Sequence, residues 1–191
     1  MDAHYPTTFD ESTMNRERIA PPEPDEYASF YADYIDLVRG HDPLELLERQ
    51  LSTLREMCSG MTDDETRARY APGKWSIKEM LGHLTDSERV FSYRLFRISR
   101  GDATPLAGFD QDTYVAGAHS DQRPLAALVE EFLSARTATL RLAQGLSADE
   151  WSRRGVANGV PVSARALLYI TGGHVAHHFN ILRDRYGVVI P

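Results

Sequence analysis

Three of the seven histidines of this chain lie close together near its C-terminus and have the residue type and spacing for metal chemistry. His174, His177 and His178 fall within five consecutive residues. In a helix, residues four apart lie on one face with their Cβ atoms about 5–6 Å apart, so His174 and His178 can present two imidazoles to one ion. His177 lies near that face, but a turn of 3.6 residues brings His178 closer in angle to His174. We therefore take His174 and His178 as candidate ligands.

A secure metal site needs a third ligand, and His83 is the candidate. It lies seven residues after an expected helix start at Ser76, while His178 lies eight residues before the expected end of the last helix at Tyr186. These depths are roughly 10 and 12 Å, so the imidazoles would meet if the two helices are antiparallel neighbours. Three neutral imidazoles with an open fourth position form the catalytic type of zinc site. The spacing alone leaves open that these are ordinary hydrogen-bonded or surface histidines.

Other residues near the expected site have two interpretations each. Asp86, one turn after His83, could accept an imidazole N–H and so orient the ring, but Asp86 and Glu88 could equally be solvated helix charges, which is the commoner case. Gly172 and Gly173 precede His174, and each costs about 1 kcal/mol in a helix relative to alanine. Two such residues in succession indicate a close helix approach or space for a pocket.

Four amphipathic segments must position these side chains. The second has the best-defined start, because Ser76 and Glu79 form a capping box and Trp75 and Met80 a hydrophobic staple. Proline in the first turn, an Asn-Gly turn before the last segment and a glycine after it mark other boundaries. The expected helices cover residues 43–58, 76–100, 125–142 and 163–186.

These segments predict an all-α protein, a four-helix bundle, with no convincing strand pattern. The connection 101–124 is long enough to cross the whole bundle, so the helices on either side of it could run parallel. Before the bundle domain, residues 41–191, we expect an N-terminal unit, residues 1–40, made of a proline-containing tail and a short amphipathic helix. The aromatic stripe of that helix, which includes Tyr31 and Tyr34, either packs on the domain or covers a pocket.

Length and composition limit the class of protein. A chain of 191 residues can bury a core without stapling metals, so a metal would serve function. The net charge of −7 argues against binding nucleic acid, and the lack of a long apolar run argues against a membrane span. The single cysteine, Cys58, excludes an internal disulfide and suits a reducing compartment, and the N-terminus does not resemble a signal peptide. We therefore expect a cytoplasmic protein that binds neither nucleic acid nor membrane.

The motifs together resemble the DinB-like superfamily. The resemblance rests on WSIKEMLGHLTDSE at residues 75–88, GHVAHH at 173–178 and GFDQDTY at 108–114. It implies a bundle with up-down-down-up connectivity, which makes the helices of His83 and His178 antiparallel. It further implies a divalent ion, zinc or nickel, held by His83, His174 and His178, and a homodimer.

Two kinds of function follow from this resemblance. The first is an enzyme acting on a small molecule, either a metal-dependent hydrolase that activates water or a transferase that uses a low-molecular-weight thiol. The alternative is a non-catalytic metal-binding or association module. No general acid or base is evident beside the histidines, and Cys58 falls on a core position, so any reactive thiol must come from outside the chain.

Overall fold

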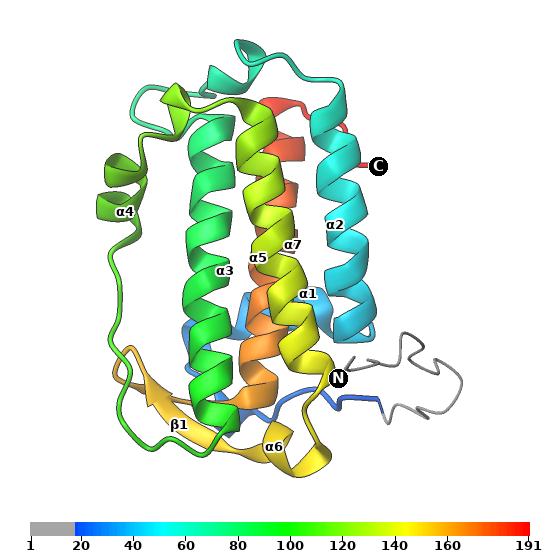
Figure 1. The fold of residues 1–191 in the computed structure, drawn as a ribbon, viewed down its shortest axis with the longest axis vertical. Helices are drawn as coiled ribbons and strands as arrows, with labels where there is room; N and C mark the ends of the chain where they lie inside the picture. Colours follow the sequence, from blue (N-terminus) through cyan, green and yellow to red (C-terminus); the bar gives the residue numbers. More distant parts are fainter. Residues whose placement is uncertain (1–17) are drawn as a thin grey trace, which may run out of the picture.

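Four long helices form the body of the molecule (Figure 1). The computed structural model describes residues 18–191. In the view of Figure 1, α2 and α7 run upward and α3 and α5 downward, which confirms the up-down-down-up bundle. The helices are α2 (Pro43–Ser59), α3 (Ile77–Ser99), α5 (Leu125–Gln144) and α7 (Ala164–Tyr186).

Local signals in the sequence account for where these helices begin and end. Asp42 accepts hydrogen bonds from the amides of Leu44 and Glu45 at the start of α2, and Ser76 forms the expected capping box with Glu79 at the start of α3. Ser163 caps α7, which ends at Gly187 in the left-handed conformation (φ 70°). The four expected helices are confirmed to within one or two residues at each end.

The connection after α3 runs along the outside of the bundle from one end to the other (Figure 1) and makes α3 and α5 parallel. It contains a helix that the sequence reading did not place, α4 (Gln111–Ala118), which Asp110 caps through the amide of Thr113. A 3₁₀ turn, Ser120–Gln122, then leads to α5.

A short β-hairpin contradicts the expectation that the chain contains no strands. After α6 (Ala148–Ser152), strands β1 (Arg154–Ala157) and β2 (Val160–Ser163) pair antiparallel. Asn158 and Gly159 both have positive φ, as in the tight turns that favour this dipeptide. Strands of four residues are too short to show a clear alternation of apolar and polar residues.

The N-terminal segment packs on the bundle. It contains two 3₁₀ turns, Pro24–Glu26 and Ser29–Tyr31, and then the short helix α1 (Ala32–Val38). α1 lies against α7, and the carboxylate of the buried Glu26 pairs with Arg165 and accepts a hydrogen bond from Ser163. Residues 1–17 of the expected tail lie outside the described residues.

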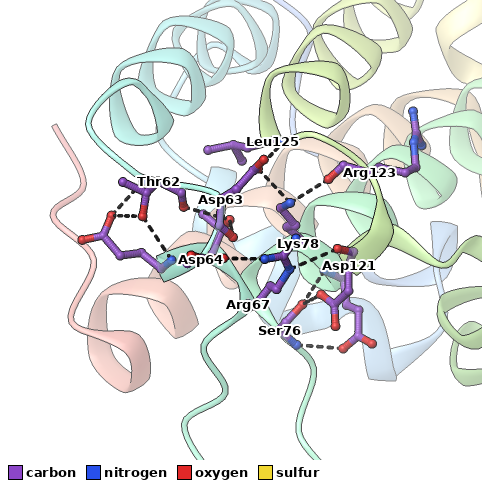
Figure 2. A network of polar contacts seen from close by, with 12 residues as sticks. Thr62, Asp63, Asp64, Arg67, Ser76, Lys78, Asp121, Arg123 and Leu125 are labelled. Atoms are coloured by element: carbon purple, nitrogen blue, oxygen red, sulfur yellow. Dashed lines mark hydrogen bonds and ion pairs between the residues drawn. The ribbon is translucent and has the colours of Figure 1, made fainter.

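A network of polar contacts closes one end of the bundle (Figure 2). The fully buried Lys78 pairs with Asp63 (2.8 Å) and donates to the carbonyl of Arg123 (2.6 Å), while Asp63 also accepts from the amide of Leu125 (2.7 Å). These bonds join the start of α3 to the α2–α3 loop and to the start of α5, and so fix the end of the bundle nearest His83. Within residues 18–191, no helix is both long and apolar enough to cross a membrane.

Candidate metal centre

The structure brings the three predicted ligands together in the interior. His83 on α3 and His174 and His178 on α7 are all buried, and one ring nitrogen of each lies within 4.8 Å of the others. His174 Nε2 is 2.9 Å from His83 Nε2 and 3.2 Å from His178 Nε2. The antiparallel packing of α3 on α7 therefore matches the depths of the two helical positions.

The arrangement of these nitrogens fits a bound cation. A single proton can bridge only one pair of them, and the remaining contact at His174 Nε2 would then be unfavourable. Three lone pairs directed at one ion account for both contacts. A tetrahedral ion with bonds of about 2.0–2.1 Å holds its nitrogens about 3.3 Å apart, close to the observed separations.

Burial keeps all three imidazoles neutral. It lowers the pKa of His83 to about 4 and lowers the pKa values of His174 and His178 well below the ordinary value. The pKa of His174 is lowered further because protonation of this ring and of His178 or His83 would bring like charges together. Because neutral imidazole is the form that binds metal ions, the site is ready for a cation at neutral pH.

Aromatic rings surround the cluster. The ring centroid of Trp75 lies 4.7 Å from that of His83, and the rings of Phe91 and Tyr34 each lie 5.6 Å from that of His174. Trp75 directly precedes the N-cap of α3, Phe91 lies on α3, and Tyr34 lies on α1. This shell lowers the local polarity and holds the imidazoles in place. His178 Nδ1 is buried and has no hydrogen-bond partner within the described chain, so its ring is held by packing.

Close helix contacts at the glycine pair bring α1 and α2 to this region of α7. A Cβ atom at Gly173 would lie 2.0 Å from the carbonyl oxygen of Tyr34, and one at Gly172 would lie 2.9 Å from Leu47 Cδ1. The glycines therefore serve close helix approach, one of the two interpretations of the sequence. Gly173 lets α1 place Tyr34 beside His174.

The neighbouring polar residues differ in their environments. His177 is half-buried, and its ring lies outside the cluster of ring nitrogens, tilted against the ring of Tyr34 with the centroids 5.3 Å apart. Asp86 accepts a hydrogen bond from Arg89 (3.3 Å), and within residues 18–191 none joins it to His83. Glu88 is not a solvated helix charge, because it is 2% exposed and pairs with Arg136.

Glu88 belongs to a buried network that the sequence reading missed. Arg136 on α5 donates to both carboxylate oxygens of Glu88 (2.9 and 2.8 Å) and to Gln50 Oε1 on α2 (2.6 Å). Gln50 in turn donates to the carbonyl of Gly172 on α7 (2.8 Å), two residues before His174. The network thus ties all four long helices together beside the site. One feature of the sequence could have indicated this network. Arg136 places a charge at a core position of its helix, between Leu133 and Leu140.

Comparison with known proteins assigns the family. Residues 46–182 match the model of the DinB superfamily, and the chain belongs to this superfamily, as the motifs indicated.

Among solved structures, YfiT from Bacillus subtilis, described as "a probable metal-dependent hydrolase with an unusual four-helix bundle topology", aligns with a TM-score of 0.70 and 16% identity over 88% of this chain and 94% of that one. A mycothiol-dependent maleylpyruvate isomerase aligns with a TM-score of 0.60 and 20% identity over 78% of this chain and 60% of that one.

A sequence relative from Oceanobacillus iheyensis, named "Putative metal-dependent hydrolase OB0413", is 27% identical over 75 residues, which are 39% of this chain and 43% of that protein. This chain therefore matches less than half of the relative's length. The structural similarities, at this level of identity, establish the shared fold.

Proposed function

We propose that His83, His174 and His178 bind a divalent metal ion, zinc or nickel, and that the protein is a metal-dependent hydrolase acting on a small molecule. The observation that carries the proposal is the meeting of three buried, neutral imidazole nitrogens from two antiparallel helices. Three protein ligands leave a coordination position free, as in catalytic sites. The description of YfiT and the name of the Oceanobacillus relative both support hydrolysis.

The residues of this chain prepare the site for such chemistry. When bound, the ion would supply Lewis acidity at its free coordination position. The protein contributes neutral ligands, held by the close packing of α3 on α7, and an aromatic shell from Trp75, Phe91 and Tyr34 that limits access of water. A dry, preorganised site strengthens every electrostatic interaction made inside it.

A second candidate is a transferase that uses a low-molecular-weight thiol, as the similarity to the mycothiol-dependent isomerase suggests. The chain does not supply a reactive sulfur of its own in residues 18–191. Cys58 is 5% exposed, and burial raises its pKa to about 11, so it is almost entirely the unreactive thiol at neutral pH. A thiol substrate or cofactor would have to bring its sulfur to the free coordination position.

Metal analysis tests the ligand assignment. The purified protein should contain about one equivalent of a divalent ion, and His83→Ala, His174→Ala and His178→Ala should each lose it. His177→Ala is the matched control, because this histidine lies on the same helix outside the cluster, and this variant should keep the metal. Full metal content in His83→Ala or in His178→Ala would overturn the assignment.

Turnover assays separate an enzyme from a non-catalytic metal-binding module. Metal-loaded protein would be incubated with ester, amide and lactone substrates, and with low-molecular-weight thiols plus electrophilic acceptors. Hydrolysis that stops on chelation and is absent in His83→Ala supports the hydrolase, and thiol-dependent turnover supports the transferase. The absence of any turnover in the panel favours the module. The homodimer also stays a proposal, which light scattering of the purified protein tests.

A further inference from the structure

A buried arginine on α3 lacks an acidic partner. Arg94 is 3% exposed and donates from Nη2 to the carbonyl oxygen of Ala107 (2.7 Å). In the part of the chain that the structure describes, no carboxylate pairs with it. Burying an unpaired charge is strongly unfavourable, so a guanidinium in this position needs an explanation.

Arg136 shows how the same fold treats a buried arginine that has a structural role. Its guanidinium makes two hydrogen bonds to the carboxylate of Glu88 and a third to Gln50. Both arginines lie in long helices of the bundle and both are buried, but among the described residues an acidic side chain pairs with Arg136 and none with Arg94. Within residues 18–191, Arg94 therefore has no acidic counter-charge, and its polar partners are the carbonyl oxygen of Ala107 and the hydroxyl of Tyr31.

Arg94 lies on the same face of α3 as His83. Eleven residues separate them, which at 100° per residue leaves an offset of only about 20° and a distance of about 16 Å along the helix. Helical side chains lean toward the N-terminus, so the guanidinium extends back toward His83. Ser87 and Phe91 occupy this face between the two residues; the Oγ of Ser87 is buried without a hydrogen-bond partner among the described residues, and Phe91 contacts His174.

Aromatic side chains surround Arg94 and continue toward the histidines. The guanidinium carbon lies 6.0 Å from the ring centroid of Phe109, and the charge of Arg94 acts on the Tyr31 phenol, partly offsetting the rise of its pKa on burial. Tyr31 and Tyr34 have centroids 6.3 Å apart, and Tyr34 reaches the ring of His174. The N-terminal segment and the connection after α3 thus both supply aromatic groups beside Arg94, and the tyrosines continue from there to His174.

We infer that Arg94 binds the anionic group of a small organic ligand, a carboxylate or phosphate carried on an apolar body, whose other end extends toward the histidine cluster. The planar guanidinium has five donors, of which one bonds Ala107 and another the hydroxyl of Tyr31, and the remaining donors can match the two oxygens of such a group. The aromatic rings suit the apolar body. Such a ligand would be the substrate class of the proposed metal-dependent enzyme. The inference rests on the proposed function only for the direction in which the ligand extends from Arg94.

Binding to the metal-free protein tests the anion site without relying on catalysis. Calorimetric titrations would use 3-phenylpropionate and phenyl phosphate as anionic probes, with 3-phenylpropanol as the neutral probe. We expect the wild-type protein to bind at least one anion about tenfold or more tightly than the alcohol. Arg94→Gln should weaken anion binding by about 10- to 100-fold, the range for a charged hydrogen bond, and leave alcohol binding unchanged. The tighter of the two anions identifies the group.

Arg97→Gln is the matched control, because it removes the same charge from the next turn of α3, where the side chain is 23% exposed and pairs with Asp102. It should bind the anions within twofold of wild type. Arg94→Lys keeps the charge without the forked geometry and should lose part of the affinity, which covers the case in which Arg94→Gln does not fold. Failure of the wild type to bind either anion, unchanged affinity in folded Arg94 variants, or an equal loss in Arg97→Gln would overturn the inference.

Two further measurements keep this inference separate from the proposed function. Arg94→Gln should retain its metal, whereas His83→Ala should lose the metal and still bind the anion. If the wild-type protein binds an anion through Arg94 but no metal, the metal proposal fails and the anion site stands. If it binds metal but neither anion, the anion site fails alone.

Discussion

Arg136→Met should be among the most destabilising single substitutions in this protein. The side chain of Arg136 is fully buried and that of its partner Glu88 is 1% exposed. Removing the guanidinium leaves a buried carboxylate without a counter-charge, which costs about 3–5 kcal/mol, and the lost bond to Gln50 adds about 1 kcal/mol. Against a total stability of about 5–15 kcal/mol, this is a large fraction. For a chain of this length the melting temperature should fall by roughly 8–24 °C.

Urea unfolding followed by circular dichroism measures the effect. The double variant Arg136→Met/Glu88→Leu removes both charges, and it should recover most of the stability, since well-packed apolar side chains can replace a buried ion pair. Arg89→Met is the control, because Arg89 pairs with Glu131 at a half-exposed site, where an ion pair contributes about 1 kcal/mol or less.

Two results would refute the reasoning about the unpaired charge. If Arg136→Met costs no more than Arg89→Met, the carboxylate of Glu88 finds another partner or water. If the double variant is as unstable as the single one, the loss comes from packing and not from charge.

Three further predictions concern the glycine pair, the cysteine and the histidines. Gly173→Ala forces a Cβ to within 2.0 Å of the Tyr34 carbonyl and should cost at least about 1–3 kcal/mol in urea unfolding, whereas Gly117→Ala, with no atom within 4 Å, should be neutral or stabilising. Cys58, with its pKa raised to about 11, should react with iodoacetamide at pH 8 only after unfolding, and rapid alkylation of the native protein would contradict its burial. The folded-state pKa of His83 is about 4 and lies below the unfolded value of 6.5, so the unfolded metal-free chain binds a proton first. Below pH 6.5 His83 alone should lower the stability by up to about 3 kcal/mol toward pH 4, and His174 and His178, whose pKa values are also lowered, should add to this loss. The fall, measured by urea unfolding at each pH, should be less steep in His83→Asn.

Much of the fold could be read from the sequence because its signals are local. The capping box at Ser76 and Glu79 satisfies backbone donors within one turn, and Gly187 ends α7 by adopting a conformation that other residues avoid. Such effects involve neighbours in the chain. The hairpin and α4 escaped prediction because strands of four residues and a helix of two turns contain too few positions for a clear period.

The histidine cluster could also be predicted from the sequence, because its signals lie within single helices. His174 and His178 share a helix face, and the depth of His83 along its own helix needs only a helix start and the rise per residue. The environment of Glu88 could not be predicted from the sequence, because nothing next to it in the chain distinguishes it from Asp86. One carboxylate is buried against Arg136, whereas the other pairs with Arg89 at a partly exposed position.

By itself, then, the sequence determined four helices, their ends and a set of histidines able to meet at one depth. The tertiary structure alone decided that the ring nitrogens converge, that Arg136 is neutralised across the bundle, and that Arg94 is buried with no acidic partner in the described chain. The physical reason is that helix formation depends on bonds between near neighbours, whereas burial and charge pairing depend on residues that only the packing of distant helices brings together.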